Sequence, residues 1–154
     1  MKELKMETFE NMVTIERPVE DVFAFLADFK NVPTWNYAIE ETTKTSAGPI
    51  GVGTTYRQTR AMPMRSEEGF EVIDFEPMRR LEIQGEIGPF WTRSGYVLTP
   101  VAGGTRLTNE VDLEATSVFP RLVAPLVVSR IKAAVAQNLR KLKQVLEDGG
   151  QHDF

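Results

Sequence analysis

The sequence predicts an α+β domain in which a curved, seven-stranded antiparallel sheet wraps around a long C-terminal helix, with two short helices after the first strand. Three observations support this prediction. A strand-like segment precedes two short helical pieces, a long region of strand pattern with turn signals follows, and a sustained helical stripe completes the order. Because short turns join the strands, neighbours in the chain should pair antiparallel. The 154 residues are enough for one core, so the whole chain, residues 1–154, is expected to form a single domain.

The first strand and the two short helices occupy the N-terminal region. Residues 8–16 alternate between apolar and polar side chains, which predicts a half-buried strand. Pro18 suits the first turn of a helix, and an apolar stripe follows at helical spacing: Val19, Val22, Phe23 and Leu26. A second helical piece, residues 29–35, ends at Trp35. Such short helices are marginal alone in water. We therefore expect them to support the long helix and close one end of the sheet, with Trp35 at the rim.

Strand signals return after Trp35, in six segments separated by glycine and proline turns. The predicted strands cover residues 37–45, 54–62, 65–75, 79–87, 91–100 and 104–114. A sheet of this width must cover its apolar face, and one helix is too narrow to cover all of it. The sequence therefore predicts that part of the space between sheet and helix is either sealed by the short helices or left as a pocket.

The last predicted element is a long amphipathic helix. Its apolar residues recur at steps of three and four: Val128, Ile131, Val135, Leu139, Leu142 and Leu146. Pro120 is a candidate for the first turn, and Pro125 for a kink. Gly149 and Gly150 are expected to end the helix and to leave residues 149–154 as a loose tail, outside a core of about residues 6–148.

The composition excludes several kinds of chemistry. The chain has no cysteine, and its one histidine, His152, lies in the expected tail, so neither a thiol nucleophile nor a serine–histidine relay is available from the fold. The sequence holds no metal-ligand cluster, and we expect no metal and no cofactor. The net charge of -4 and the lack of a recognised motif argue against nucleic-acid binding. No segment resembles a signal peptide or a bilayer span, so we expect a cytoplasmic protein that is not an integral membrane protein, as a monomer or homodimer.

Three segments carry a resemblance to a known family: ERPVEDVFAFLADFKNVPTW (residues 16–35), FEPMRRLEI (75–83) and YVLTPVAGGTRLTNEV (96–111). With them the chain resembles the START-related (SRPBCC) superfamily, which has the helix-grip fold, and within it the polyketide cyclase/dehydrase and lipid-transport branch. The resemblance covers nearly the whole chain. It implies a deep apolar cavity between the sheet and the long helix, used for lipids, polyketides or other small hydrophobic molecules.

Three functions remain open on these grounds. The first is binding of a small hydrophobic ligand, such as a lipid or polyketide, in the cavity. The second is a cyclase or dehydratase that acts on a poly-β-keto substrate in the same place. The third is binding of an acidic protein partner by basic residues on or near the long helix, although solvation of an exposed face explains these residues more simply: Arg121, Arg130, Arg140, Lys141 and Lys143.

Asn109 is the clearest polar candidate inside the predicted cavity. In the strand at residues 104–114 it shares the interior face with Leu107, Val111 and Leu113. Burial of an amide without a partner costs a few kcal/mol. Asn109 is therefore either a satisfied core amide or a group that binds ligand, and the position on a cavity wall favours the second interpretation.

The strand at residues 54–62 supplies further candidates, because Tyr56, Gln58, Arg60 and Met62 share one face. The resemblance implies that an aromatic residue near Tyr56 points inward, so this face would line the cavity and Arg60 would meet a carboxylate or enolate. In the alternative, a twist or bulge turns Gln58 and Arg60 out to solvent. Candidate proton donors for a cyclase are Tyr56, Arg60 and Tyr96, although no catalytic motif is present.

Aromatic and flexible side chains are the candidates for the rim of the cavity, although ordinary core packing explains most of them equally well. The ligand-binding candidates of this kind are Trp35, Tyr37, Met62, Phe90, Trp91, Phe119 and Leu126. Glu71 and Asp74 are candidates for inward acids, but the uneven pattern of residues 67–75 leaves their orientation open.

Overall fold

A computed structural model of the protein describes residues 6–88, 90–115 and 124–151 and confirms the predicted α+β fold. The chain begins with β1 (Met6–Ile15), α1 (Val19–Ala27), a 3-10 turn η1 (Phe29–Asn31) and α2 (Val32–Trp35). Six strands and the long helix follow: β2 (Ile39–Lys44), β3 (Thr55–Arg60), β4 (Ser66–Glu76), β5 (Arg80–Ile87), β6 (Phe90–Val101), β7 (Gly104–Ala115) and α3 (Ala124–Gln151).

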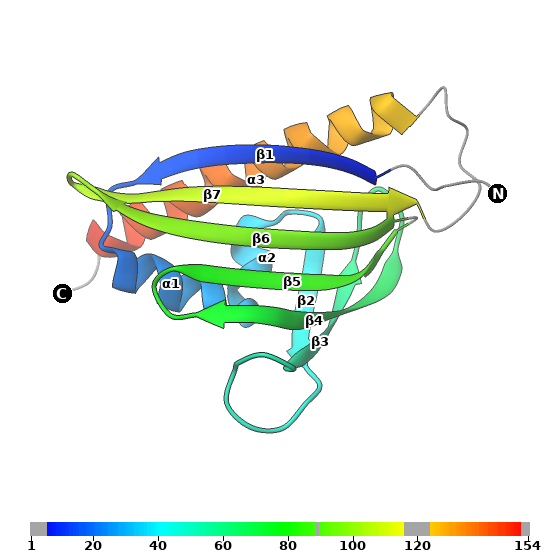
Figure 1. Ribbon diagram of the computed structural model, residues 1–154, viewed down its shortest axis with the longest axis horizontal. Helices are drawn as coiled ribbons and strands as arrows, with labels where there is room; N and C mark the ends of the chain where they lie inside the picture. Colours follow the sequence, from blue (N-terminus) through cyan, green and yellow to red (C-terminus); the bar gives the residue numbers. More distant parts are fainter. Residues whose placement is uncertain (1–5, 89, 116–123, 152–154) are drawn as a thin grey trace.

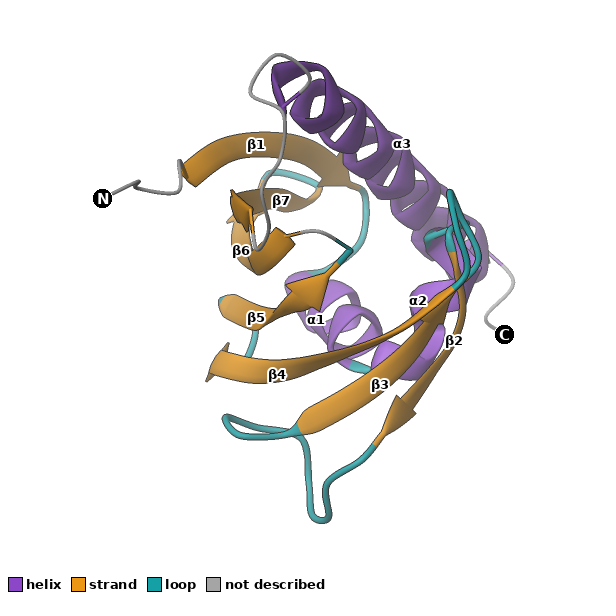
Figure 2. Cartoon of the chain, turned by 90° about the vertical axis from the view of Figure 1, so that its right-hand side faces the viewer, coloured by secondary structure: helices purple, strands orange, loops and turns teal. Residues whose placement is uncertain are grey.

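The seven strands form one antiparallel sheet in the order β1-β7-β6-β5-β4-β3-β2. The first strand of the chain therefore pairs with the last, and the remaining strands follow as a meander (Figure 1). The sheet is strongly curved, and α1, α2 and α3 lie on its concave side (Figure 2). This arrangement places the inner face of the sheet opposite the long helix, as the sequence predicts.

The described part of α3 begins at Ala124, so Pro125 lies in its first described turn. Pro120, the candidate for the first turn, lies outside the described residues. The C-terminal end of the helix differs from the prediction. The helix continues through Gly149 and Gly150 to Gln151. Glycine disfavours a helix by about 1 kcal/mol per residue but keeps its backbone donor, so two glycines at this point do not stop the hydrogen-bonded ladder.

The core joins the concave face of the sheet to α1, α2 and the second half of α3. Its fully buried side chains include Val22 and Leu26 of α1 and Leu139 and Leu142 of α3. A smaller cluster under the first half of α3 contains Phe90, Val111 and Leu113, packed against Val127, Val128 and Ile131. The apolar stripes predicted for α1 and α3 are therefore the faces that these helices bury.

Polar contacts tie the C-terminal half of α3 to the end of β1. The Arg17 guanidinium donates to the carbonyl oxygen of Leu146 at 2.8 Å and pairs with Asp21 at 2.7 Å. The Lys143 ammonium donates to the carbonyl of Thr14, and Glu147 accepts from Lys143 and from the backbone N–H of Glu16. Although burial alone would raise the pKa of Glu147, these hydrogen bonds and the nearby ammonium hold that pKa below its ordinary value.

A bulge in β4 decides which acidic residues face inward. The register with β5 shifts between Val72 and Asp74, so that Ile73 is the extra residue. Before the bulge Glu68, Phe70 and Val72 are buried, whereas Glu71 is exposed. Beyond it Asp74 is half-buried and pairs with Arg80 at 2.9 Å. This one-residue insertion is why residues 67–75 do not alternate evenly.

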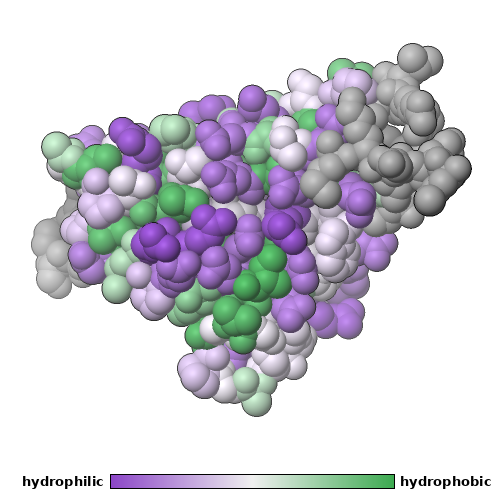
Figure 3. Space-filling model, in the orientation of Figure 1, coloured by the Kyte–Doolittle hydropathy of each residue, from purple (hydrophilic) through white to green (hydrophobic). Residues whose placement is uncertain are grey.

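The outer face of the sheet is largely hydrophilic (Figure 3). Charged side chains of opposite sign are paired along it, as in the contact of Arg80 with Asp74 and Glu82. The sheet thus has one solvated face and one face that packs on the helices, as expected for an antiparallel sheet.

Candidate functional site

A cavity of about 210 Å³ lies between the concave face of the sheet and helices α2 and α3. Its walls are mostly apolar and come from every layer of the fold, including Leu26, Phe29, Phe70, Ile83, Ile131 and Val135. Polar side chains interrupt these walls at three places. These are the inner face of β6 and β7, the inner face of β3, and the C-terminal end of α2 together with the middle of α3.

The wall formed by β6 and β7 carries the first polar group. Thr92, Ser94 and Tyr96 alternate inward along β6, and Asn109 lies opposite Tyr96 on β7. The Asn109 amide donates to the Ser94 hydroxyl at 2.9 Å and to the carbonyl of Gly95 at 3.0 Å. Asn109 therefore points inward as its alternation predicts, and its N–H groups are already used inside the core.

Tyr96 remains a neutral phenol at neutral pH. Its burial raises the pKa of the hydroxyl above the usual value, and a hydrogen bond with Ser94 offsets part of that increase. A neutral hydroxyl on a cavity wall can both donate and accept a hydrogen bond.

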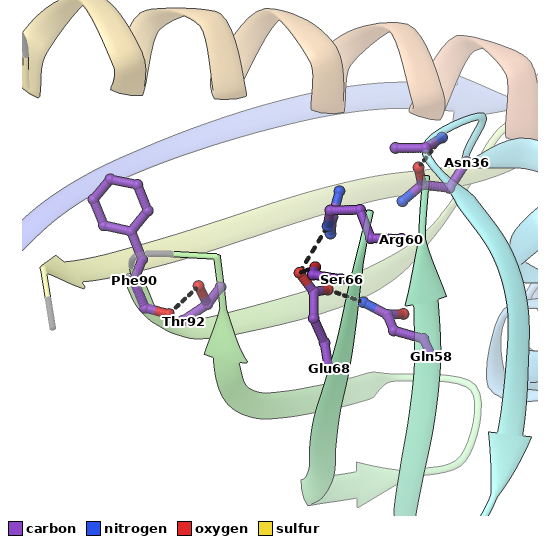
Figure 4. A network of polar contacts seen from close by, with 8 residues as sticks. Asn36, Gln58, Arg60, Ser66, Glu68, Phe90 and Thr92 are labelled. Carbon is purple, nitrogen blue, oxygen red and sulfur yellow. Dashed lines mark hydrogen bonds and ion pairs between the residues drawn. The ribbon is translucent and has the colours of Figure 1, made fainter. Parts of the chain in front are cut away.

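The wall formed by β3 carries a network around a buried carboxylate. Gln58 and Arg60 line the cavity, so the alternative in which they turn out to solvent is wrong. Figure 4 shows them gathered with Ser66 around Glu68. The Glu68 carboxylate accepts from Gln58 Nε2 at 2.8 Å, from Arg60 Nε at 2.8 Å and from Ser66 Oγ at 3.1 Å. The Glu68 side chain is 3% exposed, and that of Arg60 is 20% exposed.

Glu68 is not among the residues predicted from the sequence, although a signal for it was present. In the β3–β4 hairpin Tyr56 pairs with Phe70, Gln58 with Glu68 and Arg60 with Ser66. Directly paired residues of an antiparallel hairpin lie on the same face. A turn centred near Pro63 pairs Gln58 with Glu68. If Gln58 points inward, Glu68 must therefore point inward too.

The C-terminal end of α2 and the middle of α3 supply two polar atoms without partners in the described part of the chain. The Trp35 indole N–H and the Asn138 amide oxygen are both buried, and within the described residues neither has a hydrogen-bond partner. Both residues line the cavity, where Trp35 is 6% and Asn138 is 8% exposed. Buried polar atoms normally find partners, so this wall retains one unused donor and one unused acceptor.

Several predicted ligand contacts do not line the cavity. Tyr37, Met62, Trp91 and Leu126 have exposed side chains. On β6 the inward position is taken by Phe90, so alternation turns Trp91 outward. Phe119 lies outside the described residues. The structure thus brings together Trp35, Gln58, Arg60, Phe90, Tyr96 and Asn109 from the sequence-based candidates.

Tyr56 points inward but packs beside the cavity. Its ring stacks on Phe70 with centroids 5.1 Å apart and lies 4.8 Å from Phe29. Its hydroxyl is buried without a partner in the described part of the chain. Burial, and secondarily the negative charge of Asp28, raise the pKa of this hydroxyl. Tyr56 therefore forms part of the packed layer behind Phe70, which does line the cavity.

Two other kinds of feature are absent from the described residues. No group of His, Cys, Asp and Glu side chains there is arranged to hold a metal ion. No helix in the same ranges is long and apolar enough to cross a bilayer.

A curved antiparallel sheet that grips a long C-terminal helix, with a cavity between them, defines the helix-grip class of proteins. Within this class, the sequence profile described as polyketide cyclase/dehydrase and lipid transport matches residues 6–147. The chain therefore belongs to that family. None of the curated protein sequences gives a significant match.

Solved structures of low sequence identity share the fold. TTHA0849 from Thermus thermophilus is 20% identical, with a TM-score of 0.79 over 93% of this chain and 99% of that one. The ZhuI aromatase/cyclase from Streptomyces sp. R1128 is 14% identical, with a TM-score of 0.80 over 93% and 94%. Ara h 8.0201 is 15% identical, with a TM-score of 0.75 over 94% and 99%.

Proposed function

We propose that the protein binds a small hydrophobic molecule, such as a lipid or polyketide, in the cavity between the sheet and α3. The observation that carries this proposal is the cavity itself, which is mostly apolar and has polar groups at a few defined places. That combination is typical of small-molecule sites, in which apolar walls supply affinity and a few polar groups fix orientation. The volume of about 210 Å³ is below the roughly 300–1,000 Å³ of drug-sized pockets, which favours a compact ligand.

A direct test is native mass spectrometry of the freshly purified protein, followed by solvent extraction of bound material. The expected result is a discrete extra mass that disappears on unfolding and appears in the extract. A clean mass of the polypeptide alone, together with no binding of added apolar probes, would contradict the proposal.

The second candidate function is a cyclase or dehydratase of a poly-β-keto substrate. It is favoured by the presence of Arg60 of β3 and Tyr96 of β6 in the lining of one cavity. Arg60 N–H groups can hydrogen-bond a ketone oxygen on which negative charge develops when a carbon nucleophile attacks the carbonyl carbon. The Tyr96 hydroxyl can then give its proton to that oxygen, which becomes a hydroxyl group. The proton that the substrate methylene loses when it becomes the nucleophile restores the Tyr96 hydroxyl, so the ring closure is balanced in protons.

The test of this second function is turnover of a poly-β-keto substrate by matched variants. Tyr96→Phe and Arg60→Ala should each lower kcat by about 10²-fold or more. Tyr37→Phe is the control, because Tyr37 is an exposed tyrosine outside the cavity. Equal rates in all three variants and in the wild-type protein would remove the roles of Arg60 and Tyr96.

A further inference from the structure

The cavity wall contains one charged group, and a carboxylate stands directly behind it. Among the lining residues in the described part of the chain, Arg60 is the only one with a formal charge at neutral pH. Glu68 does not line the cavity, but its Oε2 lies 2.8 Å from Arg60 Nε. At this separation the carboxylate cancels much of the field that the guanidinium would otherwise project into the cavity.

The Glu68 carboxylate is held firmly in this position. One oxygen accepts from Gln58 and the other from Arg60 and Ser66. All four side chains come from the β3–β4 hairpin, where the register places Gln58 opposite Glu68 and Arg60 opposite Ser66 (Figure 4). A carboxylate with three donors at 3% exposure has little freedom to move away from Arg60.

This pairing uses only one edge of the guanidinium. Glu68 takes the Nε–H group, and no other residue within the described ranges bonds to the terminal nitrogens. These remaining N–H groups can donate to an oxygen atom in the cavity. Arg60 is therefore equipped as a hydrogen-bond donor whose positive charge is already compensated.

We infer that Glu68 sets the charge selectivity of the cavity, so that it accepts neutral apolar molecules bearing a carbonyl or hydroxyl oxygen and rejects carboxylates. This inference rests on the proposed binding function. A carboxylate would have to shed its hydration and would then place a second anion beside the Arg60–Glu68 pair. A ketone oxygen sheds far less hydration and receives the same N–H donors without repulsion.

The experiment compares three naphthalene probes of similar shape by isothermal titration calorimetry: 2-acetylnaphthalene, 2-naphthoate and 2-ethylnaphthalene. The wild-type protein should bind the ketone about tenfold more tightly than the carboxylate, which corresponds to about 1.4 kcal/mol. It should also bind the ketone more tightly than the ethyl compound, because only the ketone accepts from Arg60. This comparison requires no variant, so it tests the charge selectivity of the cavity even if a substitution impairs folding.

Variants then test whether Glu68 is responsible. In Glu68→Gln the affinity for 2-naphthoate should rise about tenfold, while that for 2-acetylnaphthalene changes by less than about threefold. The gain should vanish in the double variant R60Q/E68Q. Glu67→Gln is the matched control, because Glu67 is the next residue and carries the same charge, but its side chain is 56% exposed and contacts Thr59 and Arg57.

The outcomes separate this inference from the proposed function. Binding of all three probes with equal affinity, or the same gain for 2-naphthoate in Glu67→Gln as in Glu68→Gln, would overturn the role of Glu68 and leave the cavity as a binding site. Tighter binding of 2-naphthoate than of the ketone by the wild-type protein would also overturn it. Binding of none of the probes would overturn the proposed function together with this inference.

Discussion

Replacement of Asn138 by leucine should make the protein more stable. The Asn138 amide oxygen is buried and has no hydrogen-bond partner within the described residues. An unsatisfied buried acceptor costs about 1–3 kcal/mol, and leucine is a better helix former than asparagine by about 0.5 kcal/mol. Leucine has the same number of side-chain heavy atoms as asparagine and the same branching at Cγ, and the adjoining cavity leaves room for its bulkier methyl groups. The expected gain in the free energy of unfolding is therefore about 1–3 kcal/mol.

Urea denaturation followed by circular dichroism measures this gain. The midpoint should rise while the slope m stays unchanged, because the exposed area of the unfolded chain is nearly the same. Asn109→Leu is the matched control: it removes bonds of 2.9 and 3.0 Å to Ser94 and Gly95 and should cost about 1–3 kcal/mol. If Asn138→Leu were destabilising by a similar amount, Asn138 would have partners in solution and the reasoning would be wrong.

Two further predictions concern stability. Glu147→Gln should lower the free energy of unfolding by about 0.5–1 kcal/mol at neutral pH, because the contacts with Lys143 and Glu16 hold the pKa of Glu147 below its ordinary 4.5. A group with a lowered folded pKa stabilises the fold above its unfolded pKa and loses this effect as the pH falls through the folded pKa. The difference in unfolding free energy between wild type and Glu147→Gln should therefore shrink as the pH is lowered. A difference that grows in acid would refute the prediction. Gly85→Ala should destabilise the fold strongly, because a Cβ at this position would overlap the backbone carbonyl oxygen of Gly69. Gly69→Ala is the control, since a Cβ there makes only an ordinary contact of 3.6 Å with the carbonyl oxygen of Tyr56. Equal thermal midpoints for the two variants would contradict this packing.

Most of the fold could be predicted from the sequence because its elements have strong local patterns. The apolar stripe of α3 and the alternation of β7 identify both the element and its buried face, and turns with glycine or proline separate the strands. The C-terminal end of α3 was predicted wrongly, because the helix continues past the two glycines to Gln151. A helix end depends on small differences in backbone free energy, and Gly149 and Gly150 alone do not decide it.

The site was less predictable because its polar groups depend on pairing between strands. Asn109 could be placed inward from its own strand, but Glu68 could be placed only through the register of β3 with β4. The bulge at Ile73 further disguised the alternation of β4. The rim residues Tyr37, Met62 and Trp91 were assigned from residue type, which does not determine direction, and the structure leaves them exposed.

The attachment of α3 is uneven along its length, and this has a consequence for how a molecule could reach an enclosed site. The C-terminal half buries Leu139, Leu142 and Leu146 and is bonded to the β1–α1 junction. In the N-terminal half Leu126 is 56% exposed, and the side-chain bond to the sheet within the described residues is Asn11 to the carbonyl of Lys132. Opening should therefore start at the N-terminal half, and its amides should exchange with deuterium faster than those beyond residue 138. Saturation of the cavity with a ligand should slow that exchange, so amide exchange in the N-terminal half of α3 would report whether the cavity is occupied.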